Sequence, residues 1–187
     1  FNRKRIEMSK IDCSIILVNY NTCQLTLDCI YSIHKYSEGF TYEIIVVDNA
    51  STDGSKETLS KLESITFIDS GKNAGFGTAN NLGLKRAVGD YLFLLNTDTI
   101  LLENSIKKML DFYKINQKQL KLGALGCILT DADGENINSG GIFPSVSYYL
   151  KAYLRRPIDE YQIHENMPFQ KIDFVTGADL MISKNIY

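Results

Sequence analysis

Residues 43–55 are Glu43-Ile44-Ile45-Val46-Val47-Asp48-Asn49-Ala50-Ser51-Thr52-Asp53-Gly54-Ser55. The first half is a short run rich in β-branched apolar residues, which is typical of a strand buried inside a parallel sheet. The second half is a dense cluster of residues that form turns and helix caps. The stretch therefore predicts a buried strand that ends abruptly in a polar loop.

The same succession of apolar run, polar loop and helical pattern repeats along the chain. The other apolar runs are Ser14–Val18, Ile65–Ile68, Tyr91–Leu95 and Leu122–Leu129. Strands that alternate with helices in this way predict an α/β fold, in which a doubly wound and mostly parallel sheet is connected by right-handed crossovers.

Capping residues predict where the helices begin and end. Asn21 and Thr22 are expected to cap the first helix, and Gly89 is expected to end the third in a left-handed conformation. Asn104 is expected to cap the clearest helix. The apolar positions of that helix are spaced i, i+3, i+4 and i+7: Ile106, Met109, Leu110 and Tyr113.

The last third of the chain has a weaker pattern. Residues 131–134, Asp-Ala-Asp-Gly, predict a hairpin turn, and residues 140–171 predict an irregular excursion over the surface. Phe174–Ile182 predicts a final strand or strand–turn element. Residues 11–187 are expected to form one domain, and residues 1–10 a flexible N-terminal segment or a cloning remnant.

Composition excludes several classes of partner. The net charge of −2 and the pI near 5.7 give no electrostatic reason to expect a nucleic acid. No apolar run approaches the roughly 18 residues that span a bilayer. The four cysteines form no CxxC pair, which favours a reduced, cytoplasmic compartment over a disulfide-stapled chain.

Polar residues gather at the carboxyl ends of the expected strands, where open α/β sheets bind their ligands. They are Asn19-Tyr20-Asn21, Asp48-Asn49, Gly71 to Gly77, and Asn96-Thr97-Asp98. The opposite ends of the strands show no such enrichment. The sequence therefore predicts one polar binding site along one edge of the sheet.

Single motifs at this edge leave alternatives open. Asp48 would satisfy an N–H of uracil or thymine, or it caps the next turn. Gly75 and Gly77 fit G-x-G, but Asn80 replaces the third glycine and no Walker lysine follows, which favours a tight turn. Asp98 would ligate a hard divalent cation together with a diphosphate, or it caps the following helix.

As an ordered set, these motifs resemble a known family over Ile11 to Tyr187. They are similar to the inverting glycosyltransferases of family 2, which have the GT-A fold of nucleotide-diphospho-sugar transferases, and most of all to their rhamnosyltransferase-like branch. The segments that carry the resemblance are Ser14–Asn21, Val47–Ser55, Asn73–Gly77, Gly89–Thr99 and Val175–Ala178.

The resemblance implies roles for individual residues. Asn19, Tyr20, Asn21 and Asp48 would hold the nucleobase and ribose. Asn73, Phe76 and Gly77 would shape the site around the nucleoside and the diphosphate. Asp98 would match the last carboxylate of the D-x-D motif and bind Mg²⁺ or Mn²⁺, with Asn96 at its first position. Gly177, Ala178 and Asp179 would lie on the acceptor side.

The resemblance also implies the activity. We expect inverting transfer from a UDP- or dTDP-linked sugar to a glycan or lipid-linked acceptor, in bacterial cell-surface polysaccharide synthesis. The enzyme would be cytoplasmic or peripheral at the inner face of the membrane. The two alternatives are a sugar-nucleotide nucleotidyltransferase, although the first loop lacks the expected Arg- and Lys-containing sequence, and a non-catalytic nucleotide-binding module.

The general base is expected beyond Tyr187, in a chain that is truncated. Asp179 lies in the right neighbourhood, but a solvated or capping role is favoured over a catalytic one. Because a general base contributes about 10²–10⁴-fold in rate, this chain is expected to bind donor nucleotide and to transfer sugar poorly.

Overall fold

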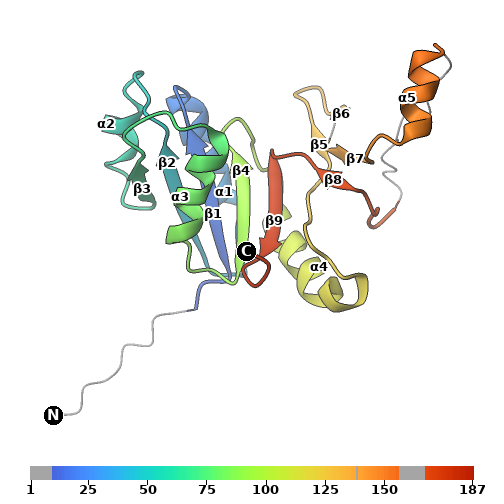
Figure 1. Cartoon of the computed structure of the whole chain (residues 1–187). Helices are drawn as coiled ribbons and strands as arrows, with labels where there is room; N and C mark the ends of the chain where they lie inside the picture. Colours follow the sequence, from blue (N-terminus) through green and yellow to red (C-terminus); the bar gives the residue numbers. More distant parts are fainter. Residues whose placement is uncertain (1–9, 138, 156–166) are drawn as a thin grey trace. The chain divides into compact units, whose positions relative to one another are not determined.

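The computed structural model describes residues 10–137, 139–155 and 167–187 (Figure 1). The chain divides into two compact units, one formed by residues 1–125 with 177–187 and the other by residues 126–176. The segment expected to be flexible or a cloning remnant, residues 1–10, falls outside the described residues except for Lys10.

A five-stranded sheet forms the centre of the first unit. Its strands, in spatial order, are β3 (Thr66–Asp69), β2 (Tyr42–Asp48), β1 (Cys13–Asn19), β4 (Tyr91–Asn96) and β9 (Asp179–Ser183). The first four run parallel and β9 pairs with β4 antiparallel. The prediction of a mostly parallel α/β sheet is confirmed.

Helices cover both faces of this sheet. They are α1 (Cys23–Tyr36), α2 (Ser55–Leu59), α3 (Phe76–Arg86) and α4 (Ser105–Leu120). Helix α3 packs on one face, in a buried cluster with Ile16, Ile45 and Val47 (Figure 1). Because side chains alternate along a strand, Ile15 and Ile44 point to the other face, where they are also buried. The sheet is therefore doubly wound, as expected.

Helix α4 has the amphipathic pattern that its sequence predicts. Its buried residues are Ile106, Met109, Leu110 and Tyr113. The expected cap is only partly right, because Asn104 occupies the N-cap position but forms no side-chain cap hydrogen bond. Its amide instead donates to the carbonyl of Glu38 at 3.0 Å, so this residue ties the start of α4 to the loop after α1.

The predicted role of Gly89 is wrong. Helix α3 ends at Arg86, Ala87 is extended, and Gly89 is not among the glycines with positive φ. A Cβ at Gly89 would lie 2.5 Å from the backbone nitrogen of Ser14. Its own N–H donates to the Ser14 hydroxyl at 2.8 Å. Glycine is thus needed for the close approach of the chain to β1, and not for a helix cap.

The predicted strand Leu122–Leu129 is also wrong. Leu125 forms only an isolated bridge with Met181, and β5 is limited to Leu129–Thr130. The run is interrupted by Gly123 and Gly126, which weaken a strand. The edge beside β4 is filled by β9, whose side chains alternate between buried and half-buried. The prediction of a strand–turn element over Phe174–Ile182 is confirmed.

The second unit contains two short ladders and one helix. Strands β5 and β6 (Asn136–Ile137) form the expected hairpin, and β7 (Gly140–Gly141) pairs with β8 (Phe174–Val175). Helix α5 (Val146–Tyr153) lies within the stretch expected to be irregular, so that expectation is wrong there. Within the described parts of the chain, we find no helix of the length and hydropathy that a bilayer crossing requires.

Candidate functional site

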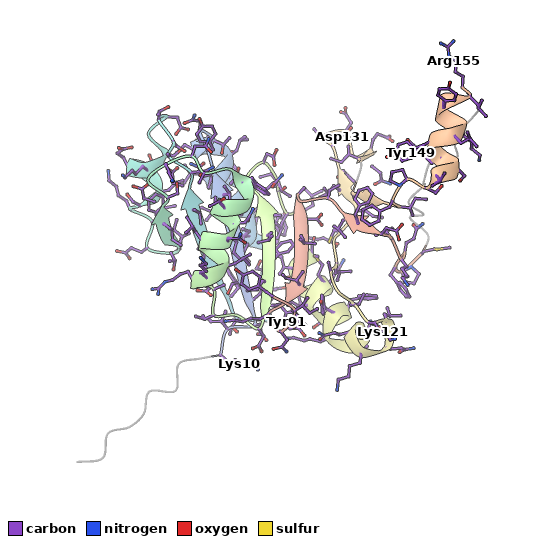
Figure 2. All side chains as sticks on the ribbon, viewed as in Figure 1. Lys10, Tyr91, Lys121, Asp131, Tyr149 and Arg155 are labelled. Atoms are coloured by element: carbon purple, nitrogen blue, oxygen red, sulfur yellow. The ribbon has the colours of Figure 1, made fainter. Side chains whose placement is uncertain are left out.

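The polar loops that follow β1, β2, β3 and β4 lie along one edge of the sheet, because these strands are parallel (Figure 1). We call these loops, residues 19–22, 48–54, 70–75 and 96–99, the rim. Lys10 and Tyr91, which are labelled in Figure 2, mark the opposite edge, where β4 begins. The rim is where an open α/β sheet binds ligands.

A fully buried amide, that of Asn19, joins three parts of the rim. Its nitrogen donates to a carboxylate oxygen of Asp48 at 2.7 Å and to the hydroxyl of Ser51 at 2.9 Å. Its oxygen accepts hydrogen bonds from the hydroxyls of Thr22, at 3.0 Å, and Thr26, at 2.8 Å. The amide has no unused donor or acceptor, so it fixes the ends of β1 and β2 and the start of α1 relative to one another.

Asp48 lies behind the surface of the rim. Its side chain has no exposed area, and its second oxygen accepts a hydrogen bond from the backbone nitrogen of Ser51 at 2.9 Å. These bonds compensate the cost of burying a carboxylate. Of the two interpretations left open by the sequence, turn capping is the one visible here, and pairing with a nucleobase stays a prediction.

The loop after β1 is attached to the loop after β2. Asn21 has a left-handed backbone, with φ of 56°, and its N–H donates to the hydroxyl of Ser51 at 2.9 Å. The side-chain oxygen of Asn21 accepts a hydrogen bond from the backbone nitrogen of Thr52 at 2.7 Å. Tyr20, between these anchored residues, is 48% exposed. An aromatic ring is thus presented to solvent from an anchored loop.

Sequence reasoning missed Asp53, which caps α1 from a distant loop. One carboxylate oxygen accepts the backbone N–H of Cys23 at 3.1 Å, and the other accepts the N–H of Ser55 at 3.1 Å and its hydroxyl. The Ser55 hydroxyl and then the Cys23 amide lower the pKa of Asp53. Thr22, which we expected to cap α1, makes no cap hydrogen bond because its hydroxyl donates to Asn19.

Asn49 was expected at this edge of the sheet, but sequence reasoning gave it no individual role. Its side chain is buried and donates to the side-chain oxygen of Asn73 at 3.0 Å. Its own oxygen accepts the N–H of Ala74 at 3.2 Å, and Asn73 accepts the N–H of Gly75 at 3.1 Å. The amide of Asn49 thereby holds the third loop. The high frequency of Asn in these loops is the sequence feature that could have identified Asn49.

The third loop leads directly into α3. Gly75 has φ of 86°, as the tight-turn interpretation requires, and α3 begins at Phe76 without a side-chain cap. The first backbone N–H groups of a helix have no partner within the helix, so an uncapped start exposes them to a ligand. Phe76 is 50% exposed, and Gly77 is also exposed.

The loop after β4 carries the most exposed carboxylate of the predicted set. Asp98 is exposed, and no described residue donates a hydrogen bond to its side chain. Asn96 is half-buried, and the hydroxyl of Thr97 lies 3.2 Å from that of Thr22. Asp98 therefore stands on an anchored loop with its oxygens available.

The predicted acceptor-side segment adjoins this loop. The N–H of Asn96 donates to the carbonyl of Ala178 at 2.9 Å, and a Cβ at Gly177 would lie 3.9 Å from the ring of Phe76. Asp179 is only 2% exposed and pairs in register with Leu95, so the expectation that it is solvated is wrong. It is buried because β9 is an edge strand that packs its alternate side chains inward.

The described residues hold no cluster of three or more His, Cys, Asp or Glu side chains that could bind a metal ion. Asp98 supplies a single available carboxylate, and the carboxylate of Asp53 is already engaged by α1 and Ser55. A hard cation such as Mg²⁺ keeps several waters and takes other ligands from a phosphate. The single carboxylate of Asp98 therefore fits a cation that binds together with a diphosphate. It does not fit a preformed metal site in which the protein supplies most of the ligands.

Comparisons with known proteins find a matching family and similar relatives. The model of the family described as glycosyl transferase family 2 matches residues 14–187. The chain is 31% identical over 118 residues to the poly(ribitol-phosphate) beta-glucosyltransferase of Bacillus spizizenii, a match that covers 60% of this chain and 19% of the relative. The chain thus spans about a fifth of that relative's length.

Solved structures show the same fold at low identity. The crystal structure of S. aureus TarS 1-349 in complex with UDP has a TM-score of 0.59 and 20% identity, covering 70% of this chain and 39% of that one. The mannosyltransferase PcManGT from Pyrobaculum calidifontis, in complex with GDP-Man and Mn²⁺, has a TM-score of 0.55 and 20% identity, covering 65% and 36%. These neighbours are GT-A glycosyltransferases.

Proposed function

The chain belongs to glycosyl transferase family 2, and from this premise we propose that it transfers a sugar, with inversion, from a UDP- or dTDP-linked donor to a glycan or lipid-linked acceptor. Cell-surface polysaccharide synthesis is the process that we propose, since the similar enzyme of Bacillus spizizenii acts on poly(ribitol-phosphate).

One observation carries the donor-binding part of the proposal: exposed side chains of the rim stand on buried, fully hydrogen-bonded supports. Tyr20 and Phe76 expose about half of their surface, and Asn21, Asn73 and Asp98 are also exposed. Behind them, Asn19 and Asp48 are completely buried. Such an edge combines positioned polar groups with aromatic surface, the usual composition of a site for a small molecule.

The diphosphate is proposed to lie near the start of α3 and Asp98. The uncapped N-terminus of α3 offers backbone N–H groups and the positive end of the helix dipole to an anion. A divalent cation, when bound, would neutralise charge that grows on the departing diphosphate. Asp98 would hold this Mg²⁺ or Mn²⁺, and Asn96 would supply a neutral oxygen at the rim.

The nucleoside is proposed to lie against the loops after β1, β2 and β3. Tyr20 offers a ring for stacking, and Asn21 and Asn73 offer polar groups. The choice of a pyrimidine is supported by the UDP complex of the similar S. aureus structure. Asp48 would act indirectly, by holding Asn19 and the loop that begins at Ser51 in position.

The acceptor is proposed to approach from the side of Gly177 and Ala178, which adjoin Phe76 and Asn96. Inverting transfer needs a general base that removes the proton of the acceptor hydroxyl. We do not assign this role to Asp179, because its carboxylate is buried and cannot face a bulky acceptor in this arrangement.

Titration calorimetry with UDP, dTDP and GDP, in Mn²⁺ and in EDTA, tests the proposal. We expect UDP and dTDP to bind more tightly than GDP, and both to bind less tightly in EDTA. Asp98→Ala should bind equally weakly in both buffers. The matched control is Asp90→Ala, at the opposite end of the same strand, where the side chain of Asp90 forms an exposed ion pair with Lys10 at 2.7 Å.

Three results would contradict the proposal. Equal affinity of the parent protein with and without metal would exclude cation binding by Asp98. Tighter binding of GDP than of UDP and dTDP would exclude a preference for pyrimidine nucleotides. If Asp90→Ala lost metal dependence as Asp98→Ala does, the effect would be general electrostatics and not ligation.

A further inference from the structure

Helix α5 exposes a large apolar surface. Four of its apolar residues are more than half exposed: Val146 (87%), Tyr149 (62%), Leu150 (57%) and Tyr153 (84%). Single exposed apolar side chains are ordinary, but a contiguous patch marks an interaction surface or a membrane contact. In Figure 2 the labelled Tyr149 lies on this helix and Arg155 beyond its end.

The four most exposed apolar residues share one face of α5, and Tyr148, which is 41% exposed, lies outside it. Val146, Tyr149, Leu150 and Tyr153 are spaced i, i+3, i+4 and i+7, which places them on a single helical stripe. Ser147 and Lys151 are spaced i and i+4 and lie on the side of the helix away from this stripe. Arg155 follows two residues after the end of α5, with a left-handed backbone of φ 50°.

The charged residues on α5 and in the two residues after it are the cations Lys151 and Arg155, while the carboxylate of Asp173 accepts the backbone N–H of Phe143 at 2.9 Å. Residues 136–158 of the sequence contain Lys151, Arg155 and Arg156 and no Asp or Glu, although the chain as a whole has a net charge of −2. The partner that fits this segment must therefore combine apolar surface with negative charge.

The apolar surface extends along the chain before α5. Ile142 and Phe143 are 51% and 66% exposed. The ring of Phe143 stacks on that of Phe174 with centroids 5.8 Å apart, so β7 and β8 hold this aromatic pair in place. We call the α5 stripe, together with Ile142 and Phe143, the α5 surface. All of it belongs to the second compact unit.

We propose that the α5 surface binds to an anionic lipid bilayer. A short amphipathic helix with Lys and Arg on its polar side and aromatic and aliphatic residues on the other lies in the plane of the bilayer interface. Tyrosine is favoured there because its ring is apolar and its hydroxyl remains hydrated. Lys151 and Arg155 extend long apolar stems and reach anionic headgroups with their charges.

A protein partner fits the same surface less well. Interfaces between proteins are enriched in Tyr, Phe and Arg but depleted of lysine, and a protein partner would need acidic groups placed to match Lys151 and Arg155. A fluid layer of anionic headgroups supplies such charges without fixed geometry. The inference rests on the α5 surface and is independent of which nucleotide the rim binds.

Cosedimentation of the whole chain with vesicles tests this inference. We expect binding to vesicles of phosphatidylglycerol and phosphatidylcholine, and much weaker binding to phosphatidylcholine alone. Lys151→Gln and Arg155→Gln should each lower the partition coefficient about fivefold. Leu150→Ser combined with Tyr153→Ser should lower it by more than about tenfold, because two side chains leave the apolar layer.

The matched control is Ile115→Ser, which removes an apolar side chain 77% exposed on α4 in the other unit. It should bind vesicles like the parent. Urea midpoints, followed by circular dichroism, check that every variant is folded. Absent or charge-independent binding by the parent, or full binding by the Leu150/Tyr153 double variant, would overturn the inference. A dimer in light scattering that this double variant dissociates would overturn it too, and would assign the surface to a second copy.

Discussion

The rim of the first unit is polar and is held by buried hydrogen bonds, whereas the α5 surface of the second unit is mainly apolar and exposed. At the rim, polar side chains are hydrogen-bonded to one another, and their supports, Asn19 and Asp48, are fully buried. Along α5, no residue whose side chain is described is buried, and the largest exposed groups are apolar. The rim is thus positioned by the protein itself, whereas α5 presents apolar surface that its own unit does not cover.

This difference predicts two kinds of response to mutation. Changes at or beneath the rim should affect folding free energy and ligand binding together, because each support joins several loops. Changes on α5 should leave the folding free energy almost unchanged. They should alter only the binding of α5 to a lipid bilayer or to another molecule.

The largest difference is expected between two aliphatic truncations. Ile45→Ala removes a fully buried side chain of β2, packed in the cluster beneath α3, and should lower the free energy of unfolding by about 2–5 kcal/mol. Leu150→Ala, at a side chain 57% exposed on α5, should change it by less than about 0.5 kcal/mol. Urea unfolding followed by circular dichroism measures both. Similar losses in the two variants would mean that α5 is packed as tightly as the sheet.

A smaller loss is expected from Asn19→Ala. The substitution leaves one oxygen of the buried Asp48 without its 2.7 Å donor and removes the acceptor of the Thr22 and Thr26 hydroxyls. An unsatisfied buried group costs about 1–3 kcal/mol, and more when it is charged. We also expect weaker nucleotide binding in calorimetry, because the loop that carries Tyr20 loses its anchor. Asn116→Ala is the control, since that amide bonds only within α4, at 2.9 Å to Phe112. Parent-like stability and affinity in Asn19→Ala would show that the loops are held by other contacts.

Asp53→Ala should have an effect that depends on pH. Removing the cap of α1 should cost about 1 kcal/mol at neutral pH. Hydrogen bonds from Ser55 and Cys23 hold the pKa of Asp53 below its ordinary value of 3.8. Its carboxylate therefore stabilises the fold fully above pH 3.8, and this contribution disappears as the pH falls through the lowered folded-state pKa.

The measurement is the difference in unfolding free energy between the parent and Asp53→Ala from pH 7 downwards. The difference should be constant above about pH 5 and shrink below pH 3.8. Asp133→Ala, at an exposed carboxyl in the β5–β6 hairpin loop, should show no such profile. A stability difference that grows as the pH falls would have the opposite pH dependence to the one expected, and it would exclude Asp53 as the cap of α1.

The smallest effect is expected from Asp98→Ala. Its side chain is exposed and receives no hydrogen bond from a described residue, so the free energy of unfolding should change by less than about 0.5 kcal/mol. Metal-dependent nucleotide binding should nevertheless be lost. A large loss of stability would instead place Asp98 among the supports of the rim, with Asn19 and Asp48.

Local sequence patterns alone predict the four parallel strands of the sheet, most of its helices and the edge that carries the rim. Apolar runs such as Glu43–Asp48 and the i, i+3, i+4 pattern of α4 depend on local periodicity, which a single sequence contains. Parallel strands bring their carboxyl ends to one edge, so the positions of Asn19, Asp48 and Asp98 along that edge follow from the strand order. The family likewise followed from the order of the motifs.

Tertiary structure alone decided which polar residues are supports and which are exposed. Asn19 and Asp98 look alike in sequence, as polar residues that end apolar strands, yet one is fully buried and the other exposed. Asp53 caps a helix that begins 30 residues before it, and β9 replaces Leu122–Leu129 beside β4. Gly89 is needed because its chain passes against Ser14, 75 residues away. Each of these outcomes depends on contacts between distant segments, and local propensity carries no information about such contacts.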